Sequence, residues 1–274
     1  MIILSILIHE MGHLFFGLIT GYHFLHIEIL GISFEKTGGH YRVRRYKNIS
    51  IGQCMMYTDN ENKNPAFFIC GGIIANLITG MGMFITACCS ATWLQGILFF
   101  VLGSINIFIA LYNAFLGSKT SDGNTLREIT GPGKNIYRIY FNRIMSIAKY
   151  LREGKSYSDM PEELFAKDMA AISPEDKVCL GREMETYRYR FHCERGEVKW
   201  IKNLAEEPVA GLVSEAYAEY LQKELSAEEI FESVLGKSKR VMYPGEYLSA
   251  ARCFISMIKR SEKSGKESKN GLSR

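Results

Sequence analysis

The sequence lacks charged side chains over two long stretches. Asp, Glu, Lys and Arg are all absent from the 55 residues between Asn64 and Ser118, and the first 22 residues contain no Lys or Arg and one acidic residue, Glu10. One membrane-spanning helix needs roughly 20 apolar residues, so the uncharged stretch is long enough for two helices and a tight turn. A fully water-soluble protein is therefore not expected.

Cysteine spacing and net charge argue against two further classes of protein. The seven cysteines are odd in number and form no CxxC pair. This pattern argues against a disulfide framework and suits reduced thiols in a protein that faces the cytoplasm. The formal net charge of +4 is too small to indicate a nucleic-acid partner. The apolar start of the chain carries polar side chains and no basic residues, so we do not expect a cleaved targeting segment.

The apolar runs predict a mostly α-helical, polytopic membrane protein with about three transmembrane helices. Trp93 falls in the turn between the second and third helices and is expected to anchor that turn at the membrane interface. An alternating Phe- and Ile-rich run, followed by Gly38 and Gly39, predicts a small β-hairpin after the first helix, within His23–Lys47. The predicted spans are Met1–Tyr22, Ala66–Ala91 and Gly96–Leu116.

The chain after about Lys119 is dense in charged residues and predicts a C-terminal soluble helical domain. We expect an irregular segment over Gly117–Gly133, then an amphipathic helix from Asn135 to Leu151, where apolar residues recur at helical spacing. The predicted organisation is a transmembrane core over 1–130, a cytoplasmic helical domain over 134–260 and a disordered polar tail over 261–274. Later helices are predicted near Glu183–Leu204, Ala210–Lys223, Ala227–Leu235 and Tyr247–Lys259.

The distribution of positive charge predicts how the chain is oriented in the membrane. Of the 33 Lys and Arg residues, six lie between His23 and Pro65 and 27 lie after Ser118. Three spans place these two regions on one side of the membrane, and the cytoplasmic side is the one that attracts Lys and Arg. We therefore predict an integral membrane protein, of the bacterial cell membrane, whose 23–65 loop and C-terminal domain are cytoplasmic.

The first predicted span contains the sequence HExxH, from His9 to His13. Positions i and i+4 share a helix face, so both imidazoles can bind one zinc ion, while Glu10 beside them can act as general base. A carboxylate in a spanning helix costs roughly 2.5–3.5 kcal/mol on insertion scales, and a metal ion offsets that cost. The structural alternative is a helix with two unrelated histidines. A catalytic zinc site also needs a third protein ligand.

The sequence resembles the site-2 protease family of intramembrane metalloproteases over roughly residues 1–130. The matching features are IHEMGH at 8–13, the Gly-rich apolar segment GGIIAN at 71–76, and Asn113 followed by the pair Asp122-Gly123. The family also has a β-hairpin after its first core helix. Two features depart from the family pattern: no proline lies between Ala114 and Ser121, and Asn124 follows the Asp-Gly pair where the family often has another glycine.

The resemblance implies roles for six residues. His9, His13 and Asp122 would bind zinc, Glu10 would be the catalytic base, and Asn76 and Asn113 would bind substrate backbone or stabilise the oxyanion. The residues themselves leave other interpretations open. Gly72, Asn76 and Gly80 form a small-residue face that suits close helix packing. Asn113 suits a helix cap, and Asp122 before a glycine suits an ordinary turn.

The resemblance implies hydrolysis of a peptide bond in a membrane-tethered protein, by a zinc metalloendopeptidase in the lipid bilayer. The soluble C-terminal domain would recruit substrate or another protein partner, regulate access, or only stabilise the protein. A second hypothesis is a non-catalytic, metal-stabilised membrane scaffold whose soluble tail binds a partner. A third is a soluble metallopeptidase, against which the 55 uncharged residues argue. Replacement of Glu10 by Gln separates the first two hypotheses, because Glu10 is not a metal ligand in either.

Overall fold

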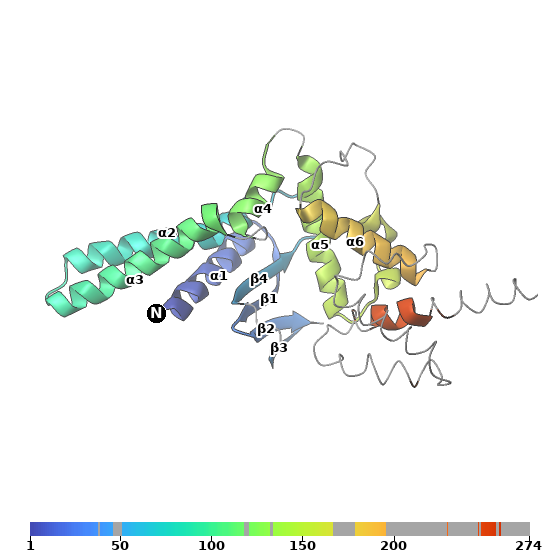
Figure 1. Cartoon of the computed structure of the whole chain (residues 1–274), viewed down its shortest axis with the longest axis horizontal. Helices are drawn as coiled ribbons and strands as arrows, with labels where there is room; N and C mark the ends of the chain where they lie inside the picture. Colours follow the sequence, from blue (N-terminus) through green and yellow to red (C-terminus); the bar gives the residue numbers. More distant parts are fainter. Residues whose placement is uncertain are drawn as a thin grey trace, which may run out of the picture. The chain divides into compact units, whose positions relative to one another are not determined.

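The computed structural model of the chain describes residues 1–37, 39–45, 51–117, 121–131, 134–166, 179–195 and 248–255, together with Glu229, Glu246 and Ile258. The chain divides into two compact units. One comprises Met1–Ser146 with Asp168–Glu183, and the other comprises Ile147–Lys167 with Met184–Arg274. Each unit is described separately below, and Figure 1 gives the order of the elements along the chain.

Three helices of the first unit are long and apolar enough to cross a membrane. They are α1 (Ile2–Ile19), α2 (Ala66–Cys88) and α3 (Trp93–Leu111), and a π-helical turn, η1 (Tyr112–Leu116), continues α3. Helix α2 packs against both α1 and α3, as Figure 1 shows. These helices confirm the three predicted spans. The third begins earlier than predicted, because Thr92 caps it by accepting a hydrogen bond from the Gln95 amide, so Trp93 is its first residue.

The three helices bury mostly small and polar residues and expose most of their large apolar ones, although α2 also buries Phe68 and Ile69. In α1, for example, Phe15 and Leu18 are exposed, whereas the residues facing the protein are Ser5, His9, Glu10, Gly12, His13 and Gly17. Helix α2 likewise buries Gly72, Asn76 and Gly80. This arrangement reverses the pattern of a soluble helix and is typical of helices whose outer faces contact lipid, where small residues allow close helix packing.

A four-stranded antiparallel sheet lies between α1 and α2 in the sequence. Its strands are β1 (His23–Ile29), β2 (Ile32–Thr37), β3 (His40–Arg45) and β4 (Gly52–Tyr57), in the order β3-β2-β1-β4. Strands β1 and β4 pack against α1. The register pairs Ile29 with Ile32 across the first turn and Thr37 with His40 across the second.

The predicted hairpin is therefore only part of this sheet. The glycine pair does fall between two strands, β2 and β3, but a second tight turn divides the run before it. Leu30 and Gly31 both have positive φ, 50° and 78°, as a two-residue hairpin turn requires. Leucine is rare at such a position, so the sequence did not indicate this turn. Strand β4 was not predicted either.

The segment that we predicted to be irregular, Gly117–Gly133, contains a short helix, α4 (Asp122–Ile129). Its Gly, Ser, Thr and Asp content suggested a loop, but Ser121 takes the extended backbone of an N-cap and the helix begins at the next residue. The amphipathic helix predicted from Asn135 is confirmed as α5 (Asn135–Arg152). Within the first unit, Asn142 of α5 accepts a hydrogen bond from the Tyr22 hydroxyl.

The second unit contains the end of α5, two short 3-10 turns and most of α6 (Cys179–Glu194). The turns are η2 (Tyr157–Asp159) and η3 (Glu162–Phe165). Phe165 of η3 stacks on Phe191 of α6 with ring centroids 4.4 Å apart. Residues 248–255 are also helical, and Arg252 donates hydrogen bonds to Ser156, Ser158 and Asp159. Two of the later predicted helices are thus confirmed in part.

Other parts of the C-terminal prediction lie outside the described residues. These are the second half of the helix predicted near Glu183–Leu204, the helix near Ala210–Lys223, nearly all of that near Ala227–Leu235, the ends of that near Tyr247–Lys259, and the tail over 261–274. The predicted domain boundaries stay a prediction.

Candidate metal centre

Helix α1 presents His9 and His13 on one buried face. The two residues are four positions apart, which aligns their side chains on successive turns. Their exposed fractions are 5% and 6%, and their Nε2 atoms are 3.2 Å apart. The rings meet edge to face. The HExxH segment therefore forms the helical pair of imidazoles that the sequence predicts.

Asp122 reaches this pair from the far end of the third span. Helix α3 continues through η1, and the chain then returns so that α4 begins at Asp122 and packs against α2 and η1. A Cβ atom at Gly123 would overlap the Ala114 carbonyl. The glycine of the Asp-Gly pair thus allows α4 to lie directly against η1, instead of forming a simple turn. The first turn of a helix also favours a carboxylate, because the helix dipole is positive there.

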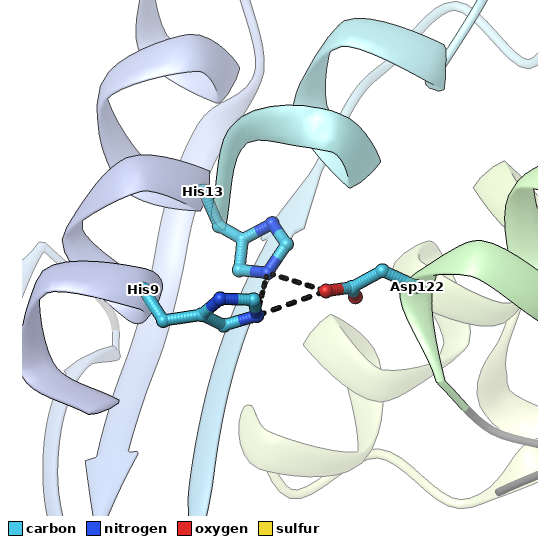
Figure 2. A group of neighbouring side chains, drawn as sticks. All are labelled: His9, His13 and Asp122. Carbon is cyan, nitrogen blue, oxygen red and sulfur yellow. Dashed lines mark hydrogen bonds and ion pairs between the residues drawn. The ribbon is translucent and has the colours of Figure 1, made fainter. Parts of the chain in front are cut away.

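The three side chains converge on one point, as Figure 2 shows. The Oδ2 atom of Asp122 lies 2.9 Å from Nε2 of His9 and 3.3 Å from Nε2 of His13. All three candidate ligand atoms lie within 4.8 Å of one another. Tetrahedral zinc with bonds near 2.0–2.1 Å holds its ligand atoms about 3.3 Å apart. The separations from His13 to Asp122 and to His9, 3.3 and 3.2 Å, match that value, and the separation from His9 to Asp122, 2.9 Å, is shorter.

A hydrogen bond to His13 fixes which of its ring nitrogens can bind a metal. Its Nδ1 atom lies 2.9 Å from the Phe68 carbonyl oxygen in α2. A carbonyl can only accept, so Nδ1 carries the proton and Nε2 keeps its lone pair for a metal. The Phe68 ring also contacts the imidazole edge to face, with centroids 5.8 Å apart. This residue therefore orients His13 through both its backbone and its ring.

Gly72 of α2 leaves the space in front of the imidazoles open. A Cβ atom at this position would lie 2.6 Å from Nε2 of both His9 and His13. The glycine face of α2 was interpreted from the sequence as possible helix packing, and Gly80 fits that interpretation because its Cβ would meet the backbone of Gly103. Gly72 has a different neighbour, namely the candidate ligands themselves.

Glu10 is buried beside the histidine pair, with 5% of its surface exposed. It lies toward β4, where a Cβ atom at Gly52 would come 2.5 Å from its Oε1 atom. The carboxylate is therefore held between α1 and the sheet and is not one of the three candidate ligands. Strand β4 helps to form the site, a role that the sequence did not indicate.

The two asparagines singled out from the sequence lie in different surroundings. Asn76 of α2 is fully buried, and its Nδ2 atom is 3.2 Å from Nδ1 of His9. Asn113 lies in η1 and donates a hydrogen bond to the Ile109 carbonyl, one turn earlier in the same helix. The structure thus brings Asn76 to the histidine pair and gives Asn113 the bond that a helix-capping interpretation predicts.

The imidazoles also control the charge of Asp122. Burial by itself raises the pKa of this carboxyl, but the neighbouring His13 and His9 outweigh burial and hold the pKa well below its ordinary range. The carboxylate is therefore ionised, as a metal ligand must be.

Sequence reasoning named the candidate ligands and missed the groups that orient them. The Phe68 carbonyl leaves no signal in a sequence, because every residue carries one. Gly52 lies in a strand whose sequence, Gly52–Tyr57, shows no strict alternation of apolar and polar residues. Gly72 was visible only as one member of a glycine-rich face.

A comparison with protein-family models gives one match. The model described as peptidase family M50 matches residues 1–257 of the 274. The curated proteins and the solved structures that were compared contain no match to the chain. The family match covers both the spans and most of the charged region, so the chain belongs to peptidase family M50, the site-2 protease family that its motifs resemble.

Proposed function

We propose that this protein is an intramembrane zinc protease that hydrolyses a peptide bond in a membrane-tethered protein substrate. Membership of the family supports a membrane metalloprotease. The observation that carries the finer proposal is the buried triangle of His9, His13 and Asp122, with a carboxylate next to it that is not part of the triangle. In this proposal the three residues bind zinc and Glu10 is the catalytic base.

The chemistry divides between the metal and the protein. Zinc held by His9, His13 and Asp122 would supply a Lewis acid that polarises the substrate carbonyl and activates water for attack. Glu10 takes a proton from the attacking water and passes it to the leaving amine. The Phe68 carbonyl accepts a hydrogen bond from Nδ1 of His13, so Nε2 keeps its lone pair for the metal. Glu10 is buried where α1 and β4 meet, which limits the positions that its carboxylate can take.

The site is reached by substrates that lie in or close to the membrane. Its candidate ligands come from α1 and from the start of α4, and both helices pack against α2. The outer faces of α1 and α2 are apolar. We propose that the 23–65 loop and the C-terminal domain lie in the cytoplasm of a bacterial cell, because all 33 Lys and Arg residues lie either between His23 and Pro65 or after Ser118. We further propose that the C-terminal helical domain binds a protein partner or the substrate.

The decisive experiment compares the wild type with Glu10→Gln during co-expression with membrane-tethered candidate substrates. The expected result is that the variant keeps stoichiometric zinc but releases no cleavage product, because Gln cannot accept the proton. His23→Ala is a matched control, since its side chain is 58% exposed and pairs with Asp59 away from the site. That control should cleave normally, whereas His9→Ala should lose both zinc and cleavage.

The scaffold hypothesis makes the opposite prediction for the same variant. If the protein acts only as a metal-stabilised membrane scaffold, Glu10→Gln retains its cellular function and no substrate changes in size. Equal cleavage by the wild type and by Glu10→Gln would also refute the assignment of Glu10 as base. Purified protein that lacks zinc would remove the basis of both hypotheses.

A further inference from the structure

Asn76 is the one asparagine side chain in contact with the histidine pair among the described residues. It has no exposed surface, and its amide nitrogen lies 3.2 Å from Nδ1 of His9. This is the ring nitrogen on the opposite side from Asp122, which contacts Nε2. The amide oxygen of Asn76 is buried and has no hydrogen-bond partner in the part of the chain that the structure describes.

The proton on His9 decides which amide atom of Asn76 is the correct partner. When the amide nitrogen donates to Nδ1, the proton of a neutral imidazole must lie on Nε2, and a protonated Nε2 cannot bind a metal. Rotation of the amide by half a turn exchanges its oxygen and nitrogen within the same volume. The oxygen then accepts a proton from Nδ1, and the lone pair of Nε2 becomes available.

We propose that Asn76 is the positioning residue for His9, and that its amide oxygen accepts the Nδ1 proton when zinc is bound. This inference rests on the proposed zinc site and gives Asn76 a different role from substrate binding or oxyanion stabilisation. In this arrangement the Asn76 side chain has no exposed surface with which a peptide substrate could make contact. The amide oxygen, which has no partner among the described residues, gains the Nδ1 proton as its partner after this rotation.

The two histidines are then oriented by two different kinds of acceptor. His13 uses the main-chain carbonyl of Phe68, which no substitution removes. His9 uses a side chain, which can be replaced. An acceptor on the outer ring nitrogen fixes the tautomer and orientation of a ligand histidine and raises its basicity, and its loss typically weakens metal binding about tenfold to a hundredfold. Substitution of Asn76 can therefore test whether this contact orients His9.

The test measures zinc affinity by chelator competition on the full-length protein in detergent, in a Glu10→Gln background so that catalysis plays no part. Asn76→Leu removes the acceptor at similar volume and should weaken zinc binding by about tenfold to a hundredfold. Asn76→Asp keeps an acceptor for Nδ1 and should retain most of the affinity. Thermal unfolding of each metal-free protein shows whether a variant merely fails to fold.

Asn106 of α3 provides a matched control. It is 1% exposed, its amide nitrogen donates to the Leu102 carbonyl, and its oxygen has no partner among the described residues. Asn106→Leu therefore removes a comparable amide that does not contact a histidine, and it should leave zinc affinity unchanged. The inference requires that Asn76→Leu and Asn106→Leu differ in zinc affinity while their metal-free forms unfold at similar temperatures.

Three outcomes would overturn the inference. Asn76→Leu could bind zinc as tightly as its parent, Asn106→Leu could lose as much affinity, or Asn76→Asp could bind as weakly as Asn76→Leu. Any of these means that Asn76 contributes packing and not an acceptor. The inference and the proposed function fail differently. Absence of zinc from the parent protein refutes the function, whereas tight zinc binding by both the parent and Asn76→Leu refutes only the role of Asn76.

Discussion

Replacement of Gly72 by alanine tests the metal centre with a single added methyl group. The new Cβ would lie 2.6 Å from Nε2 of both His9 and His13, whereas ordinary contacts begin at 3.4 Å. Each ring would have to move by about 0.8 Å, the difference between these two distances. A functional zinc site tolerates deviations of only about 0.2 Å in its ligand distances. The substitution should therefore displace both nitrogens from the ligand geometry.

The imidazoles cannot move aside at low cost. Nδ1 of His13 is hydrogen-bonded to the Phe68 carbonyl, and Nδ1 of His9 contacts the Asn76 amide. Loss of the hydrogen-bond partner of a ligand histidine weakens metal binding by up to roughly a hundredfold. We expect Gly72→Ala to weaken zinc binding by more than this and to abolish cleavage. The assay is chelator competition for zinc, followed by the co-expression cleavage assay.

Gly82 of the same helix gives the matched control. A Cβ atom there would meet nothing within 4 Å, so Gly82→Ala adds the same methyl group to α2 without touching the site. This variant should bind zinc and cleave substrate as the wild type does. Wild-type zinc affinity in Gly72→Ala would refute the assignment of the triangle as a zinc site, because no arrangement of these ligands accommodates that methyl group unchanged.

Three other predictions follow from the structure. Gly123→Ala should reduce zinc affinity in the same chelator assay, because a Cβ would overlap the Ala114 carbonyl and shift Asp122 at the start of α4. Removal of zinc by a chelator should lower the unfolding temperature, since free zinc at about 1,000 times its Kd stabilises the folded state by about 4 kcal/mol. Burial alone raises the pKa of Asp159, but Arg252 outweighs it and holds the pKa below its ordinary value. This pair therefore stabilises the fold at neutral pH and loses its effect as the pH falls below about 4. Denaturant unfolding of Arg252→Ala should show a larger loss of stability at pH 7 than in acid, because the hydrogen bonds to Ser156 and Ser158 are lost at both pH values and the ion pair only at neutral pH. Because both side chains are partly exposed, the difference between the two pH values should be well under about 1 kcal/mol.

The sequence predicted the spans well because the absence of charge is a direct physical requirement of a lipid environment. The 55 uncharged residues had to cross the membrane twice, and α2 and α3 do lie within that stretch. The two histidines and Glu10 were equally visible, since buried polar groups in an apolar helix need a compensating partner. The proposed third ligand, Asp122, depended on resemblance to a family, because its spacing alone is compatible with an ordinary turn.

The remaining features depend on tertiary contacts that local patterns do not encode. Strand β4 pairs with β1 although its sequence shows no strict alternation, because its neighbours α1 and β1 supply the packing. Helix α4 forms from residues that usually favour loops, because it packs against α2 and η1. The groups that contact Nδ1 of the two histidines, in Phe68 and Asn76, lie 55 and 67 residues away in the sequence. Only the folded chain brings such groups together.

The 113 residues that separate His9 from Asp122 have a consequence for biosynthesis. Ribosomes deliver the chain from its N-terminus, so both imidazoles enter the bilayer long before the carboxylate that completes the triangle. A growing chain that ends within α3 holds Glu10, His9 and His13 but lacks Asp122. In our proposal the protein can load zinc and cut other proteins only after its third span has been inserted and the next helix has turned back to meet the first.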